Sequence, residues 1–206
     1  MREANTREIR GFVIHPAHLD KAAQTALMED VAAIWRAAPP VRQMTRWGKP
    51  MSVAMSAAGA LGWTTDGRGY RYEPKQHDGR PWPPMPRRLE ELWRQVTGLD
   101  ATPDSCLINL YRDTARMGLH QDKDEADFGW PVVSISLGDA ALFRIGGARR
   151  SDATESLWLH SGDVVVMGGP ARLAFHGIDR IRPNSSDLVP GGGRVNLTLR
   201  MAGAAV

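Results

Sequence analysis

A histidine and a carboxylate stand two positions apart in this chain, as His120 and Asp122. In an extended segment this spacing directs both side chains to the same side, where they can bind one metal ion. A third ligand must come from elsewhere. His176 is the best candidate, because it ends an apolar run (171–175) that we expect to be a strand and is followed by Gly177. Two histidines and one carboxylate leave positions open, which suits non-haem Fe(II) with a chelating cosubstrate and dioxygen. A zinc hydrolase could use the same three ligands.

A second polar pattern lies in the last apolar run, 194–200, which reads as a strand. Side chains alternate between the two faces of a strand, so one face is aliphatic and the other carries polar groups. The polar groups are Arg194, Asn196, Thr198 and Arg200. Because a guanidinium group matches a carboxylate bidentately, this face could bind an organic acid, although a solvent-facing strand would show the same alternation. Asn109 and Tyr111 repeat the spacing upstream.

These residues lie among short β-branched and aromatic runs that are separated by Gly, Asp and Pro. After residue 104 the sequence predicts strands with no helix between them, at 105–111, 131–137, 141–146, 156–160, 163–168, 171–177 and 194–200. Such a series indicates an antiparallel sandwich or barrel. Before residue 104, apolar periodicity predicts helices over 17–37 and 86–98 and a strand over 51–57. A hairpin is predicted over 62–72, with Asp66 and Gly67 at its turn.

The composition suits a single globular domain: the chain has 206 residues and a formal net charge of +3. Its one cysteine, Cys106, excludes an intramolecular disulfide and a cysteine-rich zinc site. We expect a cytoplasmic protein, because no apolar run approaches a membrane span and the charged N-terminus does not resemble a secretory signal. Residues 31–50 contain no acid, whereas 122–127 is rich in acids. This contrast is compatible with a polyanion binder that has a cation site, and equally with ordinary solvated charge.

Several short segments are specific in combination. They are MSVAM (51–55), LGWTT (61–65), GYRY (69–72), CLINLY (106–111), LHQDKDE (119–125), VSISLG (133–138), HSGDVVVMGG (160–169), FHGI (175–178) and RVNLTLR (194–200). Together they resemble the AlkB family of Fe(II)- and 2-oxoglutarate-dependent nucleic-acid dealkylases, in particular its bacterial type. The resemblance covers about residues 44–201, and the first 40 residues match weakly. Val195 stands where the family has an aromatic residue, but it lies on the aliphatic face, so the departure concerns packing.

The resemblance implies an α+β fold: a double-stranded β-helix (jelly-roll) core with N-terminal helices and a hairpin nucleotide-recognition lid. We expect one dioxygenase domain over 1–206, with about 1–100 as supporting helices and lid and about 101–206 as the catalytic core. The resemblance also implies that the iron ligands, which form the catalytic centre, are His120, Asp122 and His176. Arg200 would pair with the distal carboxylate of 2-oxoglutarate. The remainder of that pocket would be Asn109, Tyr111, Arg194 and Asn196.

By the same resemblance, Trp63 stacks on a flipped base opposite His120, and Asp124 lies near the polar edge of that base. Tyr70 would contact the substrate backbone, and Arg150 would reach the substrate strand. The residues that line the site or its mouth would be Met55 and Lys123. The bases concerned, 1-methyladenine and 3-methylcytosine, are cationic, and a carboxylate beside an aromatic ring favours a cation.

The implied reaction is oxidative demethylation of such bases in DNA, with RNA as an alternative polymer. Its cosubstrates are 2-oxoglutarate and O₂, and its products are formaldehyde, succinate and CO₂. A monomer is expected. The first alternative is an Fe(II)/2-oxoglutarate oxygenase that acts on a small molecule or protein, which would not need the LGWTT and GYRY segments. A cupin-like binding module would not need Arg200, and a zinc hydrolase would need a positioned general base that the sequence does not offer.

Overall fold

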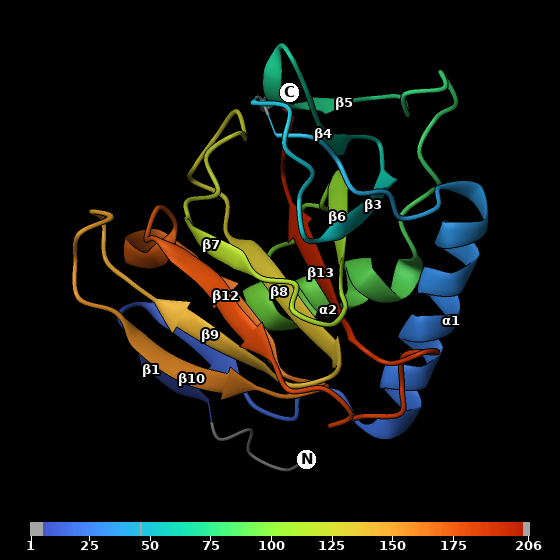
Figure 1. Cartoon of the computed structure of the whole chain (residues 1–206). Coiled ribbons are helices and arrows are strands. Elements are labelled where there is room, and N and C mark those ends of the chain that lie inside the picture. Colours follow the sequence, from blue (N-terminus) through green and yellow to red (C-terminus); the bar gives the residue numbers. More distant parts are fainter. Residues whose placement is uncertain (1–5, 46, 204–206) are drawn as a thin grey trace.

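The computed structural model describes residues 6–45 and 47–203, and its strands form two larger sheets and a separate hairpin (Figure 1). The major sheet has the order β1-β2-β11-β8-β13-β6-β3. Its strands are β1 (Arg7–Ile9), β2 (Phe12–His15), β3 (Ala54–Gly59), β6 (Ser105–Tyr111), β8 (Val132–Gly138), β11 (Val164–Met167) and β13 (Arg194–Arg200). The minor sheet has the order β10-β9-β12-β7. Its strands are β7 (Met117–His120), β9 (Ala141–Ile145), β10 (Glu155–Leu159) and β12 (His176–Ile181).

An apolar interior lies between the two sheets, because buried side chains of both belong to one cluster. Phe12 and Leu107 of the major sheet share it with Phe143 and Ile178 of the minor sheet. The rings of Phe12 and Phe143 meet edge to face, with centroids 5.9 Å apart. This two-layer antiparallel arrangement is the expected jelly-roll core.

The outer face of the major sheet is covered by two helices, α1 (Lys21–Ala37) and α2 (Arg87–Thr97). Val31 of α1 and Trp93 of α2 belong to the same buried cluster as Leu197 and Leu199 of β13. The predicted alternation in β13 is therefore correct: its aliphatic side chains pack against the helices, and its polar ones face the interior. No helix of the described residues is both long and apolar enough to cross a membrane.

Both helices stop close to the predicted residues, but α1 begins four residues later than predicted. The carboxylate of Asp20 accepts a hydrogen bond from the backbone N–H of Ala23 over 2.8 Å, which caps α1 and places its start later than residue 17. Gly98 ends α2 in the left-handed conformation, with φ 69°. The strand predicted over 51–57 is displaced and forms β3.

The predicted hairpin is confirmed as β4 (Gly62–Asp66) and β5 (Gly69–Glu73), but its turn lies one residue later than expected. Asp66 pairs with Gly69, so the two turn residues are Gly67 and Arg68. The carboxylate of Asp66 accepts from the backbone N–H of Arg68 over 2.8 Å and so stabilises this turn.

The strand predicted over 171–177 is wrong. Gly169–Ala171 forms a short 3-10 helix with Pro170 in its first turn, and His176 begins β12 rather than ending a strand. Most of this run is buried although Leu173 is 37% exposed, and Arg172, which is 4% exposed, directs its side chain inward. Three strands were not predicted: β1, β2 and β7. Since β2 pairs with β11 from His15 to Phe12, the N-terminal residues are part of the major sheet.

Candidate active site

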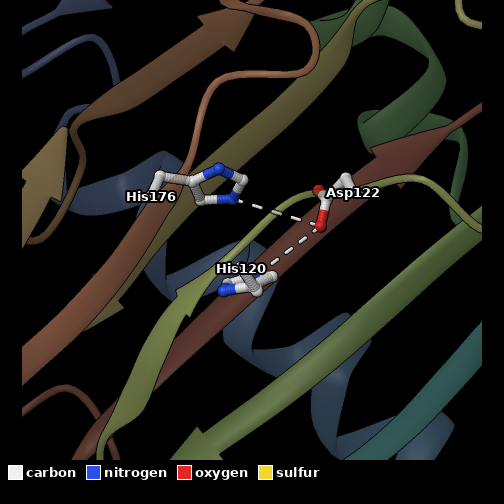
Figure 2. A group of neighbouring side chains, drawn as sticks. All are labelled: His120, Asp122 and His176. Atoms are coloured by element: carbon white, nitrogen blue, oxygen red, sulfur yellow. Dashed lines mark ion pairs between the residues drawn. The ribbon is translucent and has the colours of Figure 1, made fainter. Parts of the chain in front are cut away.

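The three predicted metal ligands lie together at one end of the minor sheet (Figure 2). His120, the last residue of β7, is paired across the ladder with His176, the first residue of β12. Asp122 follows β7 and directs Oδ1 toward both imidazoles, 3.5 Å from Nε2 of His120 and 4.0 Å from Nε2 of His176. The three ligand atoms lie within 4.8 Å of one another, which is close enough to coordinate one ion.

Backbone carbonyls select the tautomer of both histidines. Nδ1 of His120 lies 2.9 Å from the carbonyl oxygen of Gly118, and Nδ1 of His176 lies 3.1 Å from that of Ala174. Because a carbonyl oxygen only accepts, Nδ1 donates in each case, and the lone pair of Nε2 is left for a metal. Hydrogen bonds of this kind fix ligand orientation in metal sites.

The electrostatics of the three ligands also suit a divalent cation. Burial raises the pKa of Asp122, but the charge of Arg200 and the two histidines outweigh it and hold that pKa well below its usual range. Burial, with the neighbouring His120, lowers the pKa of His176 to about 4. Burial lowers the pKa of His120 as well, yet the hydrogen bond to Asp122 and its charge reverse this, and the net shift is upward. Near neutral pH, Asp122 and His176 are therefore an anion and a neutral imidazole, as metal binding requires.

A buried ion network surrounds the aspartate. Nη2 of Arg200 donates to Oδ2 of Asp122 over 2.7 Å, and Nε of Arg200 lies 3.0 Å from Oε1 of Glu125. Oε1 of Glu125 also accepts from the hydroxyl of Tyr72 over 2.7 Å, while its Oε2 pairs with Nη2 of Arg172 at 3.1 Å. Glu125 was not predicted as a site residue, and its position in the acidic segment 122–127 was the only signal for it. The network joins the lid hairpin to the metal site.

Arg172 connects the two segments that carry the metal ligands. Its Nη1 donates to the backbone carbonyl of Asp122 over 2.6 Å, and its Nε donates to that of Trp130 over 2.8 Å. A parallel contact runs from Nε2 of Gln121 to the carbonyl of Leu173 over 2.6 Å. Arg172 stands four residues before His176, so these bonds hold the His176 segment against the Asp122 segment. Sequence reasoning missed this arginine, because the run around it reads as a strand.

A second buried arginine lies at the other end of β13 and is unlike Arg200. Arg194 is 0% exposed, and its Nη2 donates to Oγ of Ser136 over 2.8 Å and to Oδ1 of Asn196 over 3.0 Å. Its Nε and Nη1 have no partner among the described residues, and Oδ1 of Asn109 also lacks one there. Burial lowers the pKa of Arg194 to about 10. A buried guanidinium with two spare donors is suited to an anionic ligand, which would supply the missing partners.

One cavity of about 860 Å³ connects the metal ligands, the two arginines and the lid hairpin. Every residue predicted to be in the site lines this cavity: Met55, Trp63, Tyr70, Asn109, Tyr111, His120, Asp122, Lys123, Asp124, Arg150, His176, Arg194, Asn196 and Arg200. The sequence therefore located the walls of the cavity, and the structure adds their mutual contacts.

The lid hairpin contributes an aromatic wall that touches the acidic segment. Nε1 of Trp63 donates to Oδ2 of Asp124 over 2.8 Å, and the rings of Trp63 and Tyr70 are stacked with centroids 5.4 Å apart. Gln43 anchors this wall: its Oε1 accepts from the backbone N–H of Thr65 over 2.7 Å, and its Nε2 donates to the carbonyl of Trp63 over 3.3 Å. Gln43 is buried and was not predicted. Its contacts hold β4 in place relative to the preceding loop.

Arg150 is held near the first metal ligand. Its Nη1 donates to the carbonyl of Leu119 over 2.8 Å, and its guanidinium lies 5.9 Å from the ring centroid of Phe175. Leu119 and Phe175 immediately precede His120 and His176, so this exposed cation bridges the two strands that bear the histidines.

Comparisons with known proteins agree with this geometry. The family model described as 2OG-Fe(II) oxygenase superfamily matches residues 11–200. A protein of Caulobacter vibrioides named alpha-ketoglutarate-dependent dioxygenase AlkB homolog is 61% identical over 198 residues, which are 96% of this chain and 90% of the relative. The chain belongs to the AlkB family of 2OG-Fe(II) oxygenases.

Other AlkB-family proteins extend the comparison. The solved structure of OsALKBH1 has a TM-score of 0.80 at 30% identity and covers 95% of this chain and 99% of that one, which confirms the expected fold. The human protein named Nucleic acid dioxygenase ALKBH1 is 34% identical over 128 residues, 60% of this chain and 33% of its own length. Because the family model begins at residue 11, the first 40 residues belong to the match more fully than the sequence motifs indicated.

As an AlkB-family member, the protein is an Fe(II)- and 2-oxoglutarate-dependent dioxygenase. The observed donor set fits both groups. One carboxylate oxygen and two imidazole nitrogens form the three-ligand arrangement that leaves positions for a chelating cosubstrate and O₂. Arg194 and Arg200 line the same cavity and both have unpartnered guanidinium nitrogens there, a charge that suits a dicarboxylate.

Proposed function

We propose that the protein removes methyl groups from N-alkylated bases of DNA, of the 1-methyladenine and 3-methylcytosine type, with RNA as an alternative substrate. The observation that carries this proposal is the hydrogen bond between Trp63 and Asp124 in the cavity that also holds the metal ligands. An aromatic ring joined to a carboxylate attracts a flat cation, and these methylated bases are cations, unlike the normal bases. The name of the human relative, Nucleic acid dioxygenase ALKBH1, supports a nucleic-acid substrate.

When Fe(II), 2-oxoglutarate and O₂ are bound, they supply the hydroxylation of the N-methyl carbon, and the products are formaldehyde, succinate, CO₂ and the unmodified base. His120, Asp122 and His176 would hold the metal. The hydrogen bonds of their Nδ1 atoms and of Asp122 keep these ligands in place before substrate arrives.

We propose a division of roles between the two arginines that differs from the one implied by resemblance. Arg200 is already paired with Asp122 and Glu125, which ties it to the metal end of the cavity. Both guanidinium groups have nitrogens without a hydrogen-bond partner among the described residues, but Arg194 has no carboxylate partner there. Arg194 would therefore take the distal carboxylate of 2-oxoglutarate, while Arg200 would act at the metal end. Tyr111 is paired with Arg194 across the ladder of β6 and β13, and burial raises the pKa of its hydroxyl to about 12. Asn109 and Asn196 would complete the pocket.

The remaining predicted residues would act on the nucleic acid. A methylated base pairs poorly, so extrusion from a duplex is least costly at the damaged position. Trp63 would stack on the extruded base, and Asp124, oriented by the indole N–H, would accept from its polar edge. Tyr70, Lys123 and Arg150 are exposed and would meet the strand. Met55 is buried and would line the base pocket.

The experiment is a turnover assay with Fe(II), 2-oxoglutarate and an oligonucleotide that carries one 1-methyladenine or 3-methylcytosine. Mass spectrometry should detect the loss of one methylene mass from the oligonucleotide, with formaldehyde and succinate formed in equal amounts. His176→Ala is the matched inactive control. Conversion of 2-oxoglutarate with no change in any methylated oligonucleotide would instead favour an oxygenase that acts on a small molecule or a protein.

A further inference from the structure

A tight turn in the loop before β3 presents Trp47 to solvent. The backbone N–H of Thr45 donates to the carbonyl of Lys49 over 2.8 Å, and the N–H of Gly48 donates back to Thr45 over 2.8 Å. Gly48 has φ +74°, which glycine adopts without strain. Trp47, the residue before it, is 69% exposed. These two hydrogen bonds connect the backbone of Thr45 with that of Gly48 and Lys49, next to Trp47.

This turn is joined to both sides of the active site. The backbone N–H of Met51 donates to the carbonyl of Gln43 over 2.9 Å, and the side chain of Gln43 holds the backbone of Trp63. Oγ of Ser52 donates to the carbonyl of Arg116, just before β7, over 2.7 Å. Trp47 itself lines the same cavity as Trp63 and the metal ligands. Since Trp47 is far more exposed than Trp63, it lies at the outer part of that cavity.

The loop that carries Trp47 exposes both apolar and cationic side chains. Val41 and Met44 are 51% and 44% exposed, and Arg42 and Lys49 are exposed beside them. We name these four residues and Trp47 the Trp47 patch. No acidic residue occurs between 31 and 50, and the exposed cations Arg116 and Arg150 line the same cavity. Exposed apolar groups in a cationic setting are characteristic of surfaces that bind single-stranded nucleic acids through stacking and phosphate contacts.

We infer that the Trp47 patch binds the nucleotide next to the target base, with the indole of Trp47 stacked on the neighbouring base and Arg42 and Lys49 near its phosphates. This inference rests on the proposed function. When the target base occupies the cavity beside Trp63, the adjoining nucleotide is the part of the polymer that reaches the outer wall, where Trp47 stands. Stacking does not discriminate among bases, so the contact contributes affinity and register without a sequence requirement.

The test measures the affinity of a fluorescein-labelled single-stranded pentadeoxynucleotide by anisotropy at fixed low salt. Trp47→Ala should weaken binding about tenfold, in line with the loss of one stacked base, and Trp47→Phe should retain most of it. The matched control is Trp158→Ala, which removes a tryptophan of β10 that lies against Arg182 and does not line the cavity. It should bind like the unmodified protein.

A second readout uses turnover. On a pentanucleotide with a central 1-methyladenine, Trp47→Ala should lower kcat/KM about tenfold, whereas the methylated mononucleotide and the uncoupled formation of succinate should be unaffected. Equal losses on both substrates, or unchanged oligonucleotide affinity, would overturn the inference. If no methylated substrate is turned over, the proposed function fails, and the affinity measurement still decides whether the Trp47 patch binds nucleic acid.

Discussion

Arg200 donates to Oδ2 of Asp122 over 2.7 Å, while Oδ1 of the same carboxylate faces the two histidines. The two oxygens of one aspartate are thus divided between a buried guanidinium and the metal position. Asp122 is ionised in the folded protein because of this partner, and its orientation is fixed before any cation binds. The metal site and the end of β13 therefore behave as one unit.

Arg200→Lys should impair both metal and cosubstrate binding. Lysine retains the charge but has no planar fork that can contact Asp122 and Glu125 together. We expect the apparent KM for 2-oxoglutarate to rise sharply and the affinity for Fe(II) to fall about 10-fold or more, with little change in oligonucleotide affinity. Steady-state kinetics measure the KM for 2-oxoglutarate, and anaerobic titration measures the affinity for Fe(II). Unchanged values of both would refute the coupling.

Removing any of the three ligands should abolish turnover. His120→Ala and His176→Ala should also lose the weak visible charge-transfer band that anaerobic Fe(II) and 2-oxoglutarate give in the unmodified protein. Asp122→Ala should be the least stable of the three, because it takes a partner from the buried Arg200; breaking a buried pair costs about 3–5 kcal/mol. Urea unfolding separates this loss of stability from the loss of metal. A ligand variant that keeps the band would remove that residue from the set.

Arg172→Met should weaken metal binding although Arg172 does not touch the metal position. It removes the bonds to the carbonyls of Asp122 and Trp130. We expect the Kd for Co(II), used as a spectroscopic substitute, to rise about 10- to 100-fold. Arg172→Lys should recover part of this. Arg180→Met, at an exposed arginine on β12, is the control and should bind Co(II) normally. If Arg172→Met bound Co(II) with normal affinity, Arg172 would not position the metal ligands and would only support the fold.

Trp63→Ala should separate demethylation from cosubstrate oxidation. Losing one stacked base costs roughly 1–3 kcal/mol, so kcat/KM on a methylated oligonucleotide should fall about 10- to 100-fold. Uncoupled formation of succinate should persist, because the metal and 2-oxoglutarate residues lie on other strands. Trp63→Phe keeps the ring but removes the donor to Asp124, so its defect should be smaller and should resemble that of Asp124→Asn. Equal loss in both assays would mean that Trp63 supports the fold.

Acid should destabilise the protein through the neighbouring rings of His15 and His18, whose centroids are 5.5 Å apart. Burial lowers the pKa of both, and His18 adds to the effect on His15. A depressed pKa means that the unfolded chain binds more protons below pH 6.5, so stability decreases as pH falls from about 7 to 5. The Tm of His18→Gln should decrease less than that of the unmodified protein over this interval. If the two Tm curves were parallel, the loss of stability in acid would not come from His15 and His18. His176, whose pKa is also lowered, is present in both proteins and would contribute equally to both curves.

The sequence alone determined the features that depend on local spacing. The alternation in 194–200 predicted which side chains of β13 face the interior, because the period of a strand is fixed by its backbone. In the same way, the two-residue spacing of His120 and Asp122 predicted that both side chains point to the same side of an extended segment. Gly98 ends α2 as expected, because capping depends on a few neighbouring residues, whereas the N-cap Asp20 was not predicted and the first helix was expected to begin at residue 17. The motifs around these positions were sufficient to identify the family.

Tertiary structure decided what depends on partners far apart in the chain. The run around Arg172 is apolar because it is buried, and burial alone does not distinguish a strand from a turn. The short strand β2 exists because β11 supplies its hydrogen bonds. In the sequence, Arg194 and Arg200 lie on the same face of one strand and cannot be told apart. Only the folded chain places Asp122 and Glu125 beside Arg200, while Arg194 has no carboxylate partner among the described residues. Which arginine has carboxylate partners is a property of the three-dimensional surroundings, because hydrogen bonds and ion pairs are satisfied across the whole fold.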